Sequence, residues 1–168
     1  MWTSIQSYSL NMDKYVVVTV SNSKARFFTL EEAEWPEYES GPHLIEQKCI
    51  SPLEDGCNQN FWSRIVSRSA QKSLLQPDHH YKFERKFAQK ITSEIINLVR
   101  INQCQRLVLV AQPHILSLVR KSFIPTIFNN IYIQELPKDV SYFNTAQIHA
   151  YLAHKNLIPY CQKVSYPR

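Results

Sequence analysis

Short, continuous runs of β-branched and apolar residues alternate with longer amphipathic stretches along the chain. Such runs predict strands that are buried on both faces, whereas apolar positions spaced by three and four predict helices. The expected strands are residues 14–20, 24–30, 43–50, 106–111 and 131–135. Only Ser-Asn-Ser separates the first two runs, which therefore predict an antiparallel hairpin.

Residues 78–101 show the clearest helical period, and Asp78 is their expected N-cap. The apolar stripe of this helix consists of Phe83, Phe87, Ile91, Ile95, Leu98 and Val99. Two shorter helices are expected, one over residues 113–122 and one that is capped by Asn144 or Thr145 and runs to His154. Residues 61–75 fit either a helix or a loop.

The order of these elements predicts a three-layer α/β fold, with a mixed central sheet and helices on both of its faces. The length of 168 residues suits one well-buried core. We therefore expect a single domain over residues 13–160, a flexible N-terminal extension over 1–12 and a tail over 161–168. The extension ends at Met12, so either Met1 or Met12 fits the native start.

Composition excludes several classes of function. Two glycines in the whole chain cannot build a P-loop or a dinucleotide-binding fingerprint. The four cysteines form no CxxC pair, which argues against a zinc ribbon or a redox motif. The acids near strand ends are Asp13, Glu135 and Asp139, and none lies within the first strand, so we expect no metal site and no cofactor. His114 directly follows a buried strand, where ligands of open α/β sheets bind, but a histidine at a helix start is usually a surface residue.

The chain has no secretion signal and no long apolar span, which predicts a cytoplasmic protein without a membrane partner. Its formal net charge of +5 is unevenly distributed. Residues 31–55 hold eight acids and one base, whereas residues 56–90 hold seven bases and two acids. Clustered cations suit phosphate groups. The candidate nucleic-acid-binding residues are Arg64, Arg68, Lys72, Lys82, Arg85 and Lys86.

Four segments resemble a known family in their order and spacing: YVVVTVSNSKARFFTLE, FERKFAQKI, RLVLVAQPHILSLVRK and QELPKDVSYFNTAQIHAYL. The family is that of the host attachment proteins, also described as bacterial and archaeal relatives of the class I peptide-release factor middle domain. The resemblance covers about residues 13–159. It implies a ribonuclease H-like sheet of the translational-machinery-component type and a role at the ribosome.

In release factors, this domain carries a Gly-Gly-Gln loop whose glutamine brings water to the peptidyl-tRNA ester. Here Ser69–Ala70–Gln71 stands at that place, so Gln71 is the only matching residue and the one catalytic candidate. Serine and alanine resist backbone angles that glycine adopts, at a cost of about 1 kcal/mol per strained position. We therefore expect a non-catalytic, RNA- or ribosome-associated binding protein whose partner is the ribosome or tRNA.

Two alternatives remain open. One is an ester hydrolase that acts on peptidyl-tRNA in ribosome rescue and uses Gln71 to position water. The other is a protein–protein interaction module that binds a partner through the acidic segment 31–55.

Overall fold

The computed structural model describes residues 13–21, 24–35, 38–51, 77–123 and 129–163, except for the side chains of residues 77–83. Within these residues the elements are β1 (Tyr15–Val20), β2 (Ala25–Glu31), β3 (His43–Ile50), α2 (Pro77–Asn102), β4 (Arg106–Ala111), α3 (Pro113–Ser122), β5 (Tyr132–Pro137) and α5 (Thr145–His154). The expected alternation of strands and helices is confirmed, and the strand over 43–50 has the predicted bounds.

The strands form one mixed sheet in the order β3-β2-β1-β4-β5. β1 pairs antiparallel with β2, which confirms the hairpin, and parallel with β4, while β5 pairs parallel with β4. The central strand β1 holds Val16, Val17 and Val18 with no exposed surface, as its continuous β-branched run predicts. β1, β4 and β5 are parallel, so their carboxyl ends share one edge of the sheet, here called the carboxyl edge.

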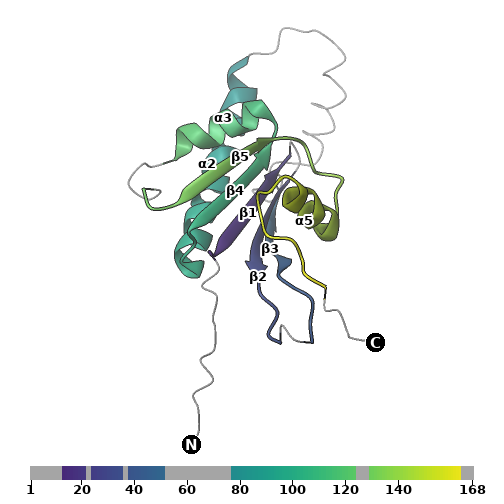
Figure 1. Ribbon diagram of the computed structural model, residues 1–168. Helices are drawn as coiled ribbons and strands as arrows, with labels where there is room; N and C mark the ends of the chain where they lie inside the picture. The colour runs from purple at the N-terminus through teal and green to yellow at the C-terminus, as the bar shows by residue number, and fades with distance from the viewer. Residues whose placement is uncertain (1–12, 22–23, 36–37, 52–76, 124–128, 164–168) are drawn as a thin grey trace, which may run out of the picture.

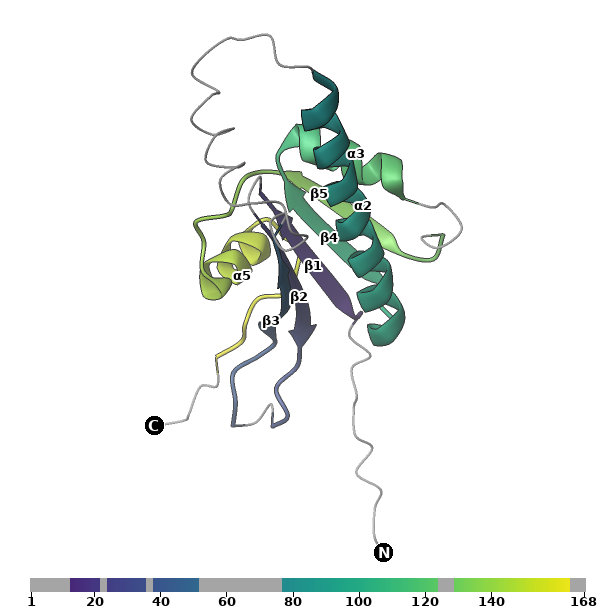
Figure 2. The same cartoon turned by 180° about the vertical axis from the view of Figure 1, so that it is seen from behind.

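Helices cover both faces of the sheet (Figures 1 and 2). On one face, Ile91 and Ile95 of α2 and Val119 of α3 pack with the side chains of alternate strand positions. On the other face, Ile148 and Leu152 of α5 form a second buried cluster. These four isoleucine and leucine side chains have no exposed surface, and each contributes about 1.5–3 kcal/mol by burial. The chain is therefore α/β with three layers.

The long helix α2 begins two residues earlier than an N-cap at Asp78 would place its first helical residue. Pro77 is the first helical residue, so Asp78 lies inside the first turn and the prediction that it is the N-cap is wrong. Proline suits the first turn because its ring fixes a helical φ and it needs no amide partner there. The predicted apolar stripe is confirmed from Phe87 onward: Ile91, Ile95, Leu98 and Val99 are buried and Phe87 is half-buried, whereas the side chain of Phe83 lies outside the described part.

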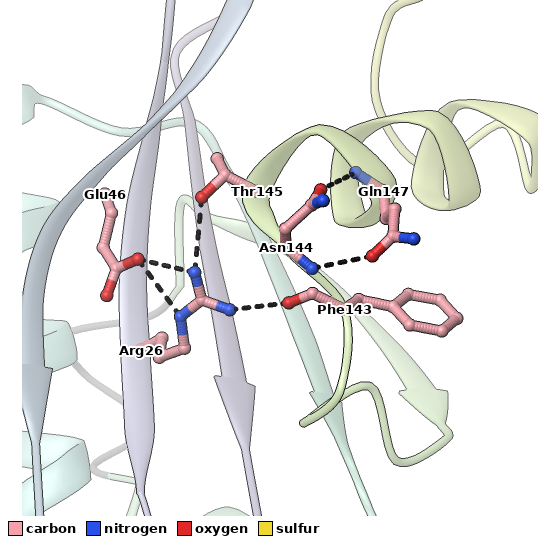
Figure 3. A network of polar contacts seen from close by, with 6 residues as sticks. All are labelled: Arg26, Glu46, Phe143, Asn144, Thr145 and Gln147. Carbon is pink, nitrogen blue, oxygen red and sulfur yellow. Dashed lines mark hydrogen bonds and ion pairs between the residues drawn. The ribbon is translucent and has the colours of Figure 1, made fainter.

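The two shorter helices have the expected bounds. α3 starts at Pro113 and ends at Ser122. At α5 the cap is Asn144 and not Thr145: Asn144 Oδ1 accepts from the backbone N–H of Gln147 at 2.8 Å, and Gln147 Oε1 accepts from the backbone N–H of Asn144 at 2.9 Å. This reciprocal pair, drawn in Figure 3, satisfies two helix-end donors that would otherwise lack partners.

Some predictions concern residues outside those that the structure describes. They include the N-terminal extension over 1–12, the choice between Met1 and Met12, the ambiguous segment 61–75 and the last part of the tail, 164–168. Within the described part of the chain, no helix combines the length and the apolar character that crossing a membrane requires.

Candidate nucleic-acid interface

The predicted cationic residues divide into described and undescribed positions. The structure does not describe Arg64, Arg68, Lys72 or the catalytic candidate Gln71. Of Lys82 it describes only the backbone, which is part of α2. Arg85 and Lys86 are exposed on the first half of α2. Neither forms an ion pair with another described residue. The structure thus brings two of the six predicted cations together on a solvent-facing helix.

The layer formed by α2 and α3 is rich in cations. Residues 84–102 and 113–122 hold six bases and two acids. One of the acids, Glu94, accepts a hydrogen bond from Lys48 Nζ of β3 at 2.8 Å, and the other, Glu84, is half-buried. The fully exposed positions of these two segments therefore carry basic and neutral side chains. The exposed cations of the layer are Arg85, Lys86, Arg100, Arg120 and Lys121.

The acidic segment lies away from the beginning of α2. Glu31 is exposed at the end of β2, and Glu32, Glu34 and Glu39 are exposed in the connection between β2 and β3, which leaves the edge where β1 begins. α2 leads directly into the start of β4, so its first residues, with Arg85 and Lys86, lie toward the opposite, carboxyl edge (Figure 2). The described carboxylates of the connection therefore do not fold across these two cations.

Other arginines are occupied by structural contacts. Arg26 of β2 donates to Glu46 Oε2 at 2.6 Å, to the carbonyl of Phe143 at 2.9 Å and to Thr145 Oγ1 at 3.3 Å (Figure 3). Its guanidinium carbon also lies 5.0 Å from the ring centroid of Phe28. With only 12% of its side chain exposed, Arg26 joins β2 and β3 to the start of α5 and is not available for a ligand.

Arg106 and Arg120 are likewise engaged. Arg106 Nε donates to Asp13 Oδ2 at 2.5 Å, and this hydrogen bond raises the pKa of the guanidinium. The same guanidinium lies beside the rings of Tyr15 and Tyr132. Arg120 of α3 forms an ion pair with Glu135 of β5 while keeping an exposed side chain. Arg106 is thus paired with Asp13, and Arg120 with Glu135.

At the carboxyl edge, one carboxylate fixes two loops. Asp139 accepts from Gln112 Nε2 at 3.1 Å and from the backbone N–H of Ser141 at 2.9 Å. Burial raises the pKa of this carboxyl, but the hydrogen bonds from Ser141 and Gln112 and the charge of Lys138 outweigh burial and lower it. Asp139 is therefore a charged anchor between the segments that follow β4 and β5.

The acids near strand ends do not converge on a metal site. Asp13 lies at the edge where β1 begins, Asp139 lies at the carboxyl edge, and Glu135 is paired with Arg120. Across the described ranges, no three histidine, cysteine, aspartate or glutamate side chains gather in a way that would hold a metal ion. Two-metal hydrolysis needs such convergence, so these residues supply no ligand set for it.

Sequence reasoning missed two cations near the carboxyl edge. Lys24 precedes β2 and is half-buried, and Lys138 follows β5 and is exposed. Both lie next to strand ends, a position that made the acids and His114 candidate site residues and that would have identified these lysines as well. A shallow depression at this edge has no room for a water-sized molecule; it is lined by Thr19, Val20, Ser21, Lys24, Arg26, Val140 and Ser141. The described residues that line this depression therefore form no pocket for a small molecule.

One of the comparisons with known proteins shows the family of this chain. No curated protein matches the chain. A solved structure described as an "Archaeal protein" is similar with a TM-score of 0.45 and 12% sequence identity, over 86% of this chain and 34% of that one. The chain thus spans about a third of that protein, and a likeness of this strength carries no inference about function. The sequence profile of a family described as "Protein required for attachment to host cells" matches residues 16–152, so the chain belongs to the host attachment protein family.

Proposed function

We propose that this protein binds RNA, as tRNA or on the ribosome in the cytoplasm, and that it contacts phosphates through the α2–α3 layer. The observation that carries the proposal is the pair Arg85 and Lys86, exposed on α2 and without an ion-pair partner among the described residues. Such a pair can release counterions from a phosphate backbone, which is the main source of sequence-independent affinity.

The distribution of charge supports one orientation of the RNA. The exposed glutamates of the β2–β3 connection lie toward the edge where β1 begins, and they repel phosphates. Arg85, Lys86 and Lys138 lie toward the carboxyl edge. An RNA ligand would therefore approach the carboxyl edge and the beginning of α2.

The test is a titration of purified tRNA, and separately of ribosomes, over a series of salt concentrations. The double variant Arg85→Ala/Lys86→Ala removes two candidate phosphate contacts. Each phosphate contact contributes roughly 0.7–0.9 to the slope of log affinity against log salt, so the slope should fall by roughly 1.5. The matched control, Lys155→Ala/Lys163→Ala, removes two exposed charges after α5 and should keep the wild-type slope.

Two results would contradict this assignment. Wild-type protein that binds neither tRNA nor ribosomes at low salt would remove RNA as the ligand. Equal losses in the two double variants would show that affinity follows net charge alone, and would remove the α2–α3 layer as the interface.

The proposal includes a relationship to the release-factor middle domain and a ribonuclease H-like type of fold. The sheet supports this, because an antiparallel hairpin precedes two further strands that run parallel to β1. Hydrolysis of peptidyl-tRNA by Gln71 is the catalytic alternative. Release from stalled complexes that Gln71→Ala lowers steeply would replace the binding proposal with the enzymatic one.

A second candidate function is binding of a basic protein segment by the β2–β3 connection. Besides its glutamates, this connection exposes Trp35 by 63% and Tyr38 by 67%. Aromatic faces beside carboxylates suit lysine and arginine side chains. A lysine-rich peptide should bind the wild type and lose affinity in Trp35→Ala/Tyr38→Ala, and failure to bind at low salt would exclude this function.

A further inference from the structure

Three polar side chains from separate parts of the chain meet beside the start of β3. Cys161 Sγ lies 3.9 Å from Nδ1 of His43, and Nε2 of His43 lies 3.4 Å from Oγ of Ser40. Cys161 is half-buried and His43 is exposed, so solutes can reach both. Because 118 residues separate Cys161 from His43, the sequence gives no sign of this cluster.

The backbone fixes the position of the thiol. Gly41 and Gln162 exchange two backbone hydrogen bonds, of 3.1 and 2.8 Å, which pair the C-terminal segment with the residues just before β3. Upstream, Ile158 is buried, and the buried His149 donates from Nε2 to the carbonyl of Pro159 at 3.0 Å. Hydrogen bonds to the backbone of Pro159 and of Gln162 therefore fix the segment on both sides of Cys161.

The order of the three groups is that of a nucleophile, a base and a group that orients the base. With its hydrogen on Nε2, His43 donates to the Ser40 hydroxyl oxygen, and its Nδ1 lone pair is then free to accept the thiol hydrogen of Cys161. The thiolate is the reactive form of cysteine, so a base held beside the thiol increases its reactivity.

We propose that Cys161 is a thiol-exchange site that takes low-molecular-weight disulfides, with His43 as its base and Ser40 as the residue that positions His43. In the exchange, His43 Nδ1 accepts the thiol proton and Cys161 Sγ attacks one sulfur of the disulfide. The disulfide bond breaks, a mixed disulfide forms on Cys161, and the departing thiolate takes the proton back from His43. No further oxidant or reductant enters this exchange.

Other cysteines of the chain are internal comparisons. Cys49 is exposed on β3, and six residues of extended strand place it about 20 Å from His43. Cys104 is buried, and burial raises the pKa of its thiol although backbone contacts with Val16 and Arg106 oppose the shift. Cys49 is therefore the exposed comparison that lies far from His43, and Cys104 is the buried one; we expect Cys161, with His43 beside it, to react faster than either.

The test treats full-length, reduced protein with oxidised glutathione at pH 7 and follows each cysteine peptide by mass spectrometry. Cys161 should form its mixed disulfide at least about tenfold faster than Cys49, since a positioned base contributes that much or more. His43→Ala should bring the rate of Cys161 down to that of Cys49, and added imidazole should restore part of it. Ser40→Ala should lower the rate less than His43→Ala does.

Equal rates at Cys161 and Cys49 in the wild type would overturn the proposal without any variant. A rate at Cys161 that His43→Ala and His43→Gln leave unchanged would also overturn it, because the thiol would then react without the imidazole. An unchanged, slow rate at the buried Cys104 in each variant shows that the fold is intact, since a general loss of structure would expose that thiol and speed up its reaction.

Discussion

Gln112 Nε2 donates to Asp139 Oδ2 at 3.1 Å and so joins the segment after β4 to the segment after β5. The same carboxylate caps the turn at Ser141 through the backbone N–H of that residue. Two parallel strands that end side by side are thereby fixed by one charged group. The hydrogen bonds also determine how this edge of the protein responds to acid.

We predict that the charged form of Asp139 stabilises the protein, and that this contribution is lost at low pH. Hydrogen bonds from Ser141 and Gln112 and the charge of Lys138 hold its folded-state pKa below the usual 3.8 in spite of partial burial. A lowered pKa contributes stability that is complete above 3.8 and is lost as the pH falls from there through the folded-state pKa.

Thermal unfolding of the wild type, Asp139→Asn and Gln112→Ala between pH 2 and pH 7 checks this contribution. Asp139→Asn should flatten the acid limb of the stability curve below about pH 4, and Gln112→Ala should flatten it in part. A limb that is equally steep in the wild type and in Asp139→Asn would contradict the role given to this carboxylate.

The fold was predictable where local pattern decides structure. The valines of β1 form a continuous β-branched run, and only a strand buried on both faces suits such a run. A helix start at Asn144 or Thr145 was predicted from their capping side chains, and the reciprocal hydrogen bonds of Asn144 and Gln147 show that Asn144 is the cap. The start of α2 was wrong by two residues because Pro77 and Asp78 both suit a first helical turn.

The polar clusters were not predictable, because long-range packing builds them. Arg26 and Phe143 are 117 residues apart, and Cys161 and His43 are 118 apart. From the sequence alone, Arg26 is one cation among nineteen bases, and only the packing of α5 on the sheet shows that it is structural. For the same reason the sequence predicts a candidate interface only where cations cluster along the chain, and Lys24 and Lys138 near the carboxyl edge were missed.

Arg26 should be the most sensitive charged residue of the described chain. Arg26→Ala leaves Glu46 without its partner and removes the donor to the carbonyl of Phe143, so we expect a loss of about 2 kcal/mol in the free energy of unfolding. Arg26→Lys keeps the charge but not the forked geometry, and should lose about half as much. Urea unfolding measures both values.

The control for this prediction is Arg85→Ala, which removes an exposed arginine from α2 and should change stability by less than about 0.5 kcal/mol. If Arg26→Ala and Arg85→Ala cost the same, the contacts drawn in Figure 3 contribute nothing to stability beyond charge.

The cap of α5 gives a third prediction. Asn144→Ala removes the side chain that accepts from the Gln147 amide and should lower the free energy of unfolding by about 1 kcal/mol. Asn97→Ala is its matched control, because Asn97 is exposed in the interior of α2, where alanine is the better helix former. Opposite signs of the two effects in urea unfolding are expected, and a loss of stability in both would argue against capping as the cause.

The end of α2 gives the fourth prediction. Gln103 has φ of 50°, a left-handed conformation that glycine adopts without strain, so Gln103→Gly should raise the free energy of unfolding by about 0.5–1 kcal/mol. Asn156 has φ of 56° after α5, and because asparagine tolerates this region, Asn156→Gly should gain less than Gln103→Gly. Asn97→Gly places the same residue inside α2 and should instead cost about 0.3–0.5 kcal/mol, since asparagine is itself a poor helix former. All three variants introduce glycine, at positions of different backbone conformation, so a common shift in urea unfolding would show that φ at Gln103 does not limit stability.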